Sequence, residues 1–174
     1  SDPSRGLGDV YKRQFSYLTQ NAAEGENYGL EISSNYFVRD NLDLYANFGL
    51  LKTKIKNWES RSDLKNRAQA HAPERNFSLG ANLSFMNNFY LKMDINGKSS
   101  FFYSDSHNNK SKSYQLVNIT LGYKKSNLST DIWIRNLFDE YYSTRGFFFG
   151  NEAPNFVDTL YKRQGDPKNI GISV

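Results

Sequence analysis

FYLKMDINGK, residues Phe89–Lys98, alternates large apolar side chains with polar and charged ones. The apolar series is Phe89, Leu91, Met93, Ile95 and Gly97, and the charged residues between its members are Lys92, Asp94 and Lys98. Neighbouring residues of a β-strand point to opposite faces, so this spacing puts every charge on one face. The stretch therefore predicts a strand with one apolar face and one polar face.

The same partition recurs along most of the chain. It is found in residues 28–38, 42–50, 77–85, 117–123 and 128–135. Where these segments contain a charge, as at Glu31, Asp43, Asp131 and Arg135, the charge opposes the large apolar side chains. Six long two-faced strands are predicted, together with a short one near residues 15–21 and a last one that begins near Ile170.

The connections between the predicted strands alternate in length. Residues 38–42, 85–89 and 123–128 are short links with Asn, Asp or Ser, as tight hairpins require. Residues 54–75, 104–112 and 138–166 are longer, polar links. Up-and-down barrels of bacterial outer membranes have short periplasmic turns, long extracellular loops and an apolar band facing lipid. The predicted fold class is therefore all-β, an antiparallel up-and-down transmembrane β-barrel of which this chain forms part.

Composition narrows the class of protein. The mean hydropathy of −0.71 does not argue against a barrel, because a barrel strand shows lipid only every second residue. No apolar run approaches the roughly 20 residues of a spanning helix, which excludes a helical membrane protein. Aromatic residues make up 16 % of the chain and many flank the short turns, which suggests an interfacial girdle or, alternatively, ordinary strand packing. The net charge of +4 is too small and scattered to indicate nucleic acid.

Both ends of the chain look unusual. Residues 9–14, DVYKRQ, resemble the translation of a sequencing adapter, so residues 1–14 are interpreted as a non-native segment. Four of those letters recur at residues 161–164, which leaves chance recurrence open. Residues 15–174 are then expected to be a barrel fragment, truncated within a last strand that lacks a closing aromatic.

Several motifs resemble the TonB-dependent outer-membrane receptors, in the C-terminal part of their barrel. The most specific is residues 135–142, RNLFDEYY, which resembles the family's penultimate-strand signature. Residues 71–80 and residues 165–171, GDPKNIG, agree with it in order and spacing. The resemblance implies a barrel of about 22 strands, of which about eight would be present here, closed around an N-terminal plug.

The resemblance also implies a function. Such receptors lie in the outer membrane of Gram-negative bacteria and import scarce ligands, most often a ferric siderophore or another iron chelate, with energy coupled through TonB. The expected partners are outer-membrane lipid, the small-molecule chelate, and TonB and the plug through parts of the receptor outside this chain. No cofactor and no nucleic acid are expected, and the ferric chelate would be the transported ligand.

Candidate site residues fall into three groups. Leu30, Ile32, Leu44, Leu91, Ile95, Ile119 and Ile132 are predicted to face lipid. Glu31, Asp43, Lys92, Asp94, Lys98, Asp131, Trp133 and Arg135 are predicted to face the barrel lumen. Ligand contacts are predicted in loop 141–158, at Tyr142, Arg145, Phe147, Phe148, Phe149 and Asn151, because aromatic rings and a guanidinium suit planar or anionic chelates. A loop that packs its own aromatics over the barrel mouth is the alternative.

Catalytic and metal sites are not predicted. The two histidines, His71 and His107, lie in different expected loops without neighbours at metal-ligand spacing. Asp139 and Glu140 are adjacent and are expected at a strand end, so turn chemistry is favoured over acid–base catalysis. An enzyme is therefore not expected. The alternatives left open are a passive porin or adhesin barrel and a soluble β-sandwich binding module.

Overall fold

A computed structural model describes residues 24–58, 61–105 and 107–174. The described residues form nine strands and one short 3₁₀ helix. They are β1 (Glu24–Arg39), β2 (Leu42–Asn57), η1 (Ser62–Leu64), β3 (Arg75–Phe85), β4 (Phe89–Lys98), β5 (Tyr114–Lys125), β6 (Leu128–Arg135), β7 (Ser143–Phe149), β8 (Thr159–Gln164) and β9 (Asn169–Ser173). The strand predicted near residues 15–21 and the segment 1–14 lie outside the described residues.

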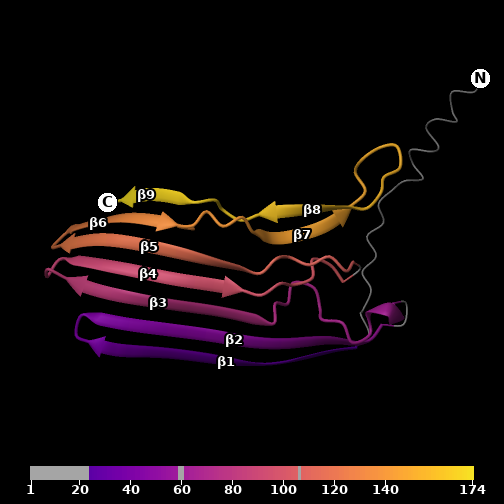
Figure 1. Ribbon diagram of the computed structural model, residues 1–174, viewed down its shortest axis with the longest axis horizontal. Coiled ribbons are helices and arrows are strands. Elements are labelled where there is room, and N and C mark those ends of the chain that lie inside the picture. The colour runs from indigo at the N-terminus through magenta and orange to yellow at the C-terminus, as the bar shows by residue number, and fades with distance from the viewer. Residues whose placement is uncertain (1–23, 59–60, 106) are drawn as a thin grey trace, which may run out of the picture.

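Seven of the strands form one antiparallel sheet in the order β1-β2-β3-β4-β5-β6-β9. Every strand from β1 to β6 pairs with its sequence neighbour, which is the up-and-down arrangement predicted. Figure 1 shows the three short turns at one end of the sheet and the long connections at the other. These are called the turn end and the loop end below. The described part is an open sheet, in which β1 and β9 are the two edges.

The loop end departs from the prediction. Residues 141–158 were expected to form an irregular loop, but β7 and β8 pair there as a separate two-stranded sheet. Two features hid this hairpin: β7 carries three consecutive Phe residues, which mask the alternation, and its partner lies beyond a long connection. The first long link is also shorter than expected, because β2 continues to Asn57.

The cross-strand register joins the apolar positions into continuous rows, because directly opposed residues share a face. One row reads Tyr36, Leu44, Ala81, Met93, Ile119, Ile134 and Ile170. The next row towards the turn end is Leu42, Leu83, Leu91, Leu121, Ile132 and Ile172. All seven residues predicted to face lipid lie on this apolar face.

The width of the apolar face can be compared with that of a membrane. The apolar face contains six rows, from the Phe85–Phe89–Tyr123 row at the turn end to the Leu30–Leu50 row at the loop end. With roughly 6.7 Å between rows, five intervals span roughly 33 Å along the strands. At a strand tilt of about 40° this is about 25 Å along the membrane normal, the height of the apolar band of outer-membrane barrels.

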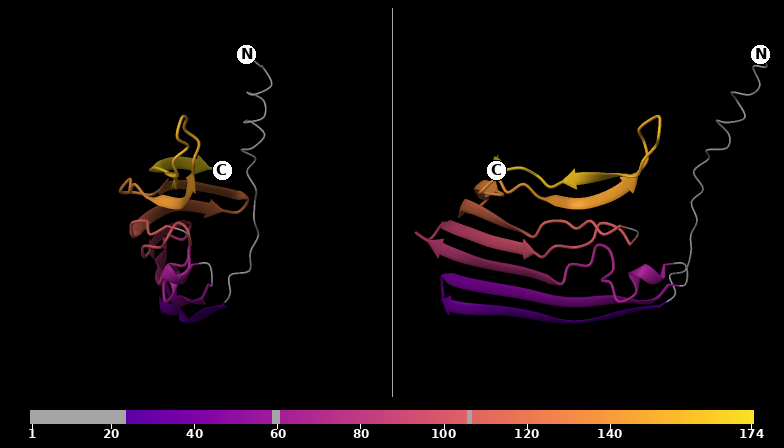
Figure 2. Two further views of the ribbon diagram at one scale, coloured as in Figure 1. Left: turned by 90° about the vertical axis from the view of Figure 1, so that its right-hand side faces the viewer. Right: turned by 45° about the vertical axis from the view of Figure 1, so that its right-hand side comes forward.

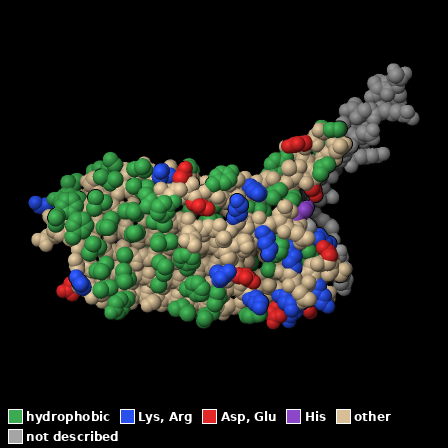
Figure 3. Space-filling model, viewed as in Figure 1, with side chains coloured by type: hydrophobic (Ala, Val, Ile, Leu, Met, Phe, Trp, Pro, Cys, Tyr) green, Lys and Arg blue, Asp and Glu red, His purple; other side chains and the backbone are tan. Residues whose placement is uncertain are grey.

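The sheet buries little of its own apolar surface. The buried apolar residues among those described are Ile55, Leu64, Phe101 and Tyr103, and all four lie at the loop end. Within the apolar rows, Leu30 and Ile32 are each 53 % exposed. Both views in Figure 2 show the strands in a single layer, and Figure 3 shows apolar side chains spread over the face of the sheet, with most charged ones at the loop end. A soluble β-sandwich would cover this face with a second sheet, so that alternative is excluded for the described part.

Aromatic rings pack over glycines of neighbouring strands at several places in the sheet. Tyr45 lies over Gly80, Tyr90 over Gly122 and Trp133 over Gly171 on the polar face. A Cβ added at any of these glycines would collide with the ring. The rings replace the side-chain contacts that a glycine cannot make, and this pairing helps to fix the register.

Candidate functional site

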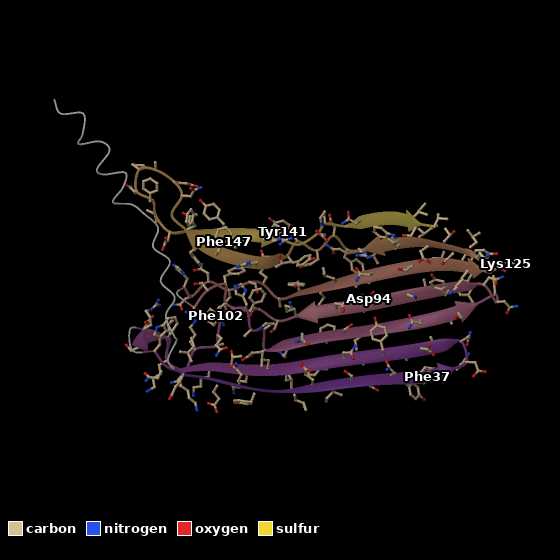
Figure 4. The ribbon with its side chains drawn as sticks, turned by 180° about the vertical axis from the view of Figure 1, so that it is seen from behind. Phe37, Asp94, Phe102, Lys125, Tyr141 and Phe147 are labelled. Carbon is tan, nitrogen blue, oxygen red and sulfur yellow. The ribbon has the colours of Figure 1, made fainter. Side chains whose placement is uncertain are left out.

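The polar face of the sheet collects the charged residues named from the sequence. The register places all eight predicted lumen-facing residues on this face. One row, for example, runs from Asp43 through Asn82, Lys92 and Thr120 to Trp133. Figure 4 shows Asp94 near the middle of the sheet, between Lys125 at the turn end and Phe102 and Phe147 at the loop end. That this face lines the lumen stays a prediction.

Hydrogen bonds connect several of these polar side chains. The Asp94 carboxylate accepts from the amide nitrogens of Asn96 at 2.6 Å and Asn118 at 2.7 Å. The Tyr90 hydroxyl donates to Asp131, and the Trp133 indole donates to the Ser173 hydroxyl at 3.2 Å. Each bond crosses between strands or follows one strand along the same face. The Asp94 and Asp131 carboxylates are therefore each held by hydrogen bonds on this face.

Asn136, in the motif that carried the family resemblance, is a buried junction between the sheet and the β7–β8 hairpin. Its side-chain nitrogen donates to the carbonyls of Glu140 at 3.0 Å and Asp166 at 3.1 Å, and its side-chain oxygen accepts from the Glu140 amide at 2.8 Å. Its φ of 50° is in the left-handed region that Asn tolerates. Asp139 accepts from the Lys168 amide at 2.8 Å. The residues of this motif thus have a structural role: they hold the segment after β6 against residues 166–168. This agrees with the turn chemistry expected for Asp139 and Glu140.

Arg67, in the β2–β3 link, binds the β4–β5 link at the loop end. Its guanidinium donates to the carbonyl of His107 at 2.7 Å, to that of Asp105 at 3.3 Å and to the Asn108 side chain at 3.2 Å, with a further short bond to the Ser104 carbonyl. Partial burial lowers the pKa of Arg67, and the nearby Asp105 carboxylate acts in the opposite direction. The side chain remains a cation, so its bonds to the loop carbonyls are charge-assisted.

Aromatic rings complete this packing. The Phe102 ring lies between two cations, with Arg67 at 4.0 Å and Lys110 at 4.3 Å from its centroid. The His107 ring stacks on Phe148 with centroids 3.5 Å apart, and its Nε2 lies 3.8 Å from the Asp158 carboxylate. Three connections that are distant in sequence therefore meet here: the β2–β3 link, the β4–β5 link and the β7–β8 hairpin.

The β7–β8 hairpin divides the predicted ligand-binding residues between its two faces. Phe148 packs on His107, and Gly146, on the same face, lies against the Tyr103 ring. Tyr142 packs on Tyr114 with centroids 4.4 Å apart and covers Gly165. These aromatics pack within the protein, which is the alternative that the sequence left open for this segment.

The other face of the hairpin carries Arg145 and Phe147. The register sets Arg145 opposite Arg163 and Phe147 opposite Tyr161. Both arginines are exposed, and the two rings stack with centroids 5.7 Å apart. Like charges directly opposite each other on adjacent strands are destabilising. The arginine pair and the two stacked rings give this face of the hairpin cationic and aromatic surface, which is suited chemically to an anionic or planar group.

The remaining predicted ligand contacts differ in exposure. Phe149 is opposite Thr159 and half-buried, and Asn151, which follows β7, is exposed. Sequence reasoning missed Arg163 and Tyr161, which belong to β8 and were read as part of a long link. The alternation of Tyr161 and Arg163 in the sequence indicates a strand. That this strand pairs with β7 could be recognised only from the structure.

The Tyr161 hydroxyl donates to the Glu152 carboxylate at 3.4 Å. Loss of solvent contact and the Glu152 charge raise the pKa of the Tyr161 phenol. The arginine–aromatic face (Arg145, Arg163, Phe147 and Tyr161) therefore combines two permanent cations, a neutral donor and two ring surfaces. This combination suits an anionic, partly aromatic ligand.

In the described ranges, no group of three or more His, Asp and Glu side chains is placed to hold a metal ion. Nor does any helix in residues 24–58, 61–105 and 107–174 have the length and apolar character to cross a membrane.

Solved structures with this fold include receptors for ferric siderophores. The ferric yersiniabactin uptake receptor FyuA from Yersinia pestis matches 87 % of this chain with a TM-score of 0.73 at 15 % identity. The siderophore receptor PiuA from Acinetobacter baumannii matches 85 % with a TM-score of 0.71 at 12 % identity. The ferric-catecholate import receptor Fiu from Escherichia coli K12, in its closed form, matches 85 % with a TM-score of 0.65 at 19 % identity.

This chain covers only 23 %, 21 % and 20 % of those three receptors, respectively, so it spans less than a quarter of their length. The family described as TonB dependent receptor-like, beta-barrel, matches residues 1–137, most of the chain. The structure agrees with that match, because the chain forms a two-faced antiparallel sheet and shares its fold with these receptors. The chain belongs to the TonB-dependent receptor family and forms part of its β-barrel.

Proposed function

We propose that this chain is the C-terminal part of the barrel of an outer-membrane receptor that binds a ferric siderophore or a related iron chelate. The receptor imports the chelate with energy coupled through TonB. The observation that carries the proposal is family membership together with a fold shared with three receptors whose names specify ferric chelates or siderophores. The plug and the TonB-contacting segment belong to the whole receptor.

In this proposal the two faces of the sheet have different surroundings. The apolar rows contact the acyl chains of the membrane, whose thickness their width matches. The polar face, with the network around Asp94 and Asp131, lines the lumen and faces the plug. The turn end is periplasmic and the loop end is extracellular, which follows the asymmetry of bacterial barrels.

The arginine–aromatic face on β7 and β8 is the proposed place of first contact with the ligand. Ferric chelates are commonly anionic, and many carry planar chelating groups. Arg145 and Arg163 supply paired cations, and Phe147 and Tyr161 supply ring surfaces for stacking. The cations Arg67 and Lys110 are already engaged with Phe102, so they hold the loops rather than the ligand.

The experiment uses the full-length receptor in a strain that depends on it for iron. Uptake of a panel of ferric siderophores is measured with radioactive iron, with and without TonB. Arg145→Gln combined with Arg163→Gln should raise the half-saturating chelate concentration by about tenfold or more, since two charge-assisted contacts are lost. Lys124→Gln combined with Lys125→Gln removes the same charge at the turn end and should leave uptake unchanged.

Two results would contradict the proposal. If no ferric chelate in the panel enters faster with the receptor than without it, the ligand class is wrong. If uptake is equal with and without TonB, the coupling is wrong. An unchanged half-saturating concentration in the double arginine variant, with uptake intact, would instead remove only the arginine–aromatic face from the binding site.

A further inference from the structure

His107 lies where the β4–β5 link meets the β7–β8 hairpin. Its ring stacks on Phe148 of β7, with an interplanar angle of 10° and centroids 3.5 Å apart. Its Nε2 atom lies 3.8 Å from the carboxylate of Asp158, the residue before β8. Figure 4 shows the two elements at the loop end, marked by Phe102 on the link and Phe147 on the hairpin. One imidazole therefore contacts the hairpin on both sides of its tip.

The β4–β5 link is braced beneath this imidazole, whereas the hairpin is not. Phe101 and Tyr103 of the link are buried, and the Tyr103 amide donates to the Asn109 carbonyl at 3.1 Å. The Arg67 guanidinium donates to the His107 carbonyl at 2.7 Å. The hairpin is a separate two-stranded sheet, and such a sheet is marginally stable on its own. The position of the hairpin therefore depends on side-chain contacts such as those of His107.

The contacts of the His107 ring depend on its charge. A distance of 3.8 Å is too long for a hydrogen bond, so the contact with Asp158 becomes an ion pair only when the ring is an imidazolium. A cation stacked over the Phe148 ring is also attracted by the ring face. The Ser104 hydroxyl, 3.3 Å from Nδ1, can donate or accept and so fits both charge states. Protonation therefore adds attraction to the hairpin and removes none of these contacts.

Other charged side chains on the packed elements are engaged with different groups. They are Arg67 of the β2–β3 link, Asp105 and Lys110 of the β4–β5 link, and Lys162 of β8. Arg67 and Asp105 lie close enough to offset each other's charge. Lys110 and Lys162 lie over the rings of Phe102 and Tyr103. Within the part of the chain that the structure describes, the carboxylate at ion-pair distance from His107 is that of Asp158.

We infer that His107 is a protonation-dependent positioning residue for the β7–β8 hairpin. Its imidazolium, paired with Asp158 and stacked on Phe148, keeps the hairpin docked on the β4–β5 link, and the hairpin undocks more often when the ring is neutral. Because the docked side carries Phe148, docking leaves the arginine–aromatic face on the free side. That docking presents this face to a ligand rests on the proposed function, whereas the docking itself does not.

The test measures docking in the full-length receptor without any siderophore. Spin labels are attached to cysteines introduced by Asn155→Cys, in the exposed hairpin tip, and Ser113→Cys, at the exposed end of the β4–β5 link. This part of the receptor contains no native cysteine. Pulsed electron paramagnetic resonance gives the distances between the labels, and hence the ratio of docked to undocked hairpins. The samples are frozen at about pH 7.5 and about pH 5.5, within the range where histidine changes its charge.

Lowering the pH should raise the docked-to-undocked ratio about threefold, because an ion pair with an exposed carboxylate contributes a change of about two- to fivefold. His107→Gln should keep the ratio at its high-pH value under both conditions, and Asp158→Asn should remove most of the response. His107→Arg supplies a permanent cation and should keep the ratio high at both pH values. His71→Gln is the matched control, since it removes the other histidine of this chain and should leave the response intact.

Several outcomes would overturn the inference. These are an unchanged ratio between the two pH values in the labelled receptor, a full response in His107→Gln or Asp158→Asn, loss of the response in His71→Gln, and equal undocking of His107→Arg and His107→Gln. Heat-modifiable migration on unboiled gels verifies that each variant is a folded barrel, and His107→Arg tests the charge separately should the glutamine variant not fold. Siderophore uptake is not measured, so a failure of this inference would leave the proposed function standing, and the reverse also holds.

Discussion

The strand ladder and the loop end of this molecule are held together by different interactions. The ladder, β1 to β6 and β9, repeats one backbone pattern, and its apolar side chains remain exposed on one face. The loop end contains the buried apolar residues and the long-range contacts of Arg67, Phe102 and His107. Stability in the ladder therefore depends on backbone pairing and, in the proposed receptor, on lipid, whereas the loop end depends on particular side chains.

The strongest test of this difference is a substitution that introduces a charged side chain on the apolar face of the ladder. Leu44→Arg in the full-length receptor puts a guanidinium on the apolar face and should cost roughly 2–4 kcal/mol near the bilayer centre. The measurement is urea-dependent folding into lipid vesicles. Ile95→Lys should behave alike.

Asn47→Arg is the matched control, because Asn47 lies on the polar face of the same strand and is exposed. It should cost less than about 1 kcal/mol. Equal costs at positions 44 and 47 would mean that the apolar face does not contact lipid.

The junction between the two regions can be weakened at Asn136. Asn136→Ala removes three side-chain hydrogen bonds of a buried residue and leaves part-buried backbone groups of Glu140 and Asp166 without this partner, which should cost about 1–3 kcal/mol. The same folding assay measures it. Asn47→Ala is the control at an exposed site, and an equally small loss in both variants would contradict the buried-junction interpretation.

The loop end should respond locally to loss of Arg67. Arg67→Ala should lower the free energy of local opening of residues 103–110 by roughly 1–2 kcal/mol, seen as faster amide hydrogen exchange, without changing exchange in β3 or β4. Arg61→Ala removes a cation that pairs with Asp63, two residues away, and should leave residues 103–110 protected. Faster exchange throughout the sheet would show that the two regions are not independent.

The smallest expected effect is a pH response at the 3₁₀ turn. The hydrogen bond from Arg61 lowers the pKa of Asp63, so this pair stabilises the folded turn above the pKa of the unfolded carboxyl, about 3.9, and the contribution is lost as the pH falls through the lower folded pKa. Because Asp63 is exposed, the effect should be slight. The protection factors of the amides at residues 62–67, which are corrected for the pH dependence of intrinsic exchange, should fall as the pH is lowered from about 5 to about 3 in the wild type. A similar change in Asp63→Asn would assign it to another group.

Much of the ladder could be predicted from alternation alone. A one-residue shift would move the apolar side chains of a strand to the other face, so the pattern at residues 42–50 or 89–98 leaves little choice of face. The motif at residues 135–142 identified the family, and the family match confirms it. The role of Asn136 as a buried junction was not visible, because its partners Glu140 and Asp166 are brought together only by folding.

The candidate ligand site could be predicted only in part. Arg145 and Phe147 were recognised by residue type, but Arg163 and Tyr161 were missed because β8 is paired through a long connection. Phe148 and Tyr142 had the same chemical character, and the structure shows them packed on His107 and Tyr114 instead. Residue type indicates what a side chain can bind, while pairing determines which face it occupies.

The sequence by itself determined the strands of the ladder, their two faces and the short turns, because these follow from a period of two residues and from local turn preferences. Tertiary structure decided how the loop end is assembled, which aromatics are covered and which cations remain free. The reason is physical: alternation is a local property of the chain, whereas contacts such as those of Arg67 with residues 104–108 join segments far apart in sequence.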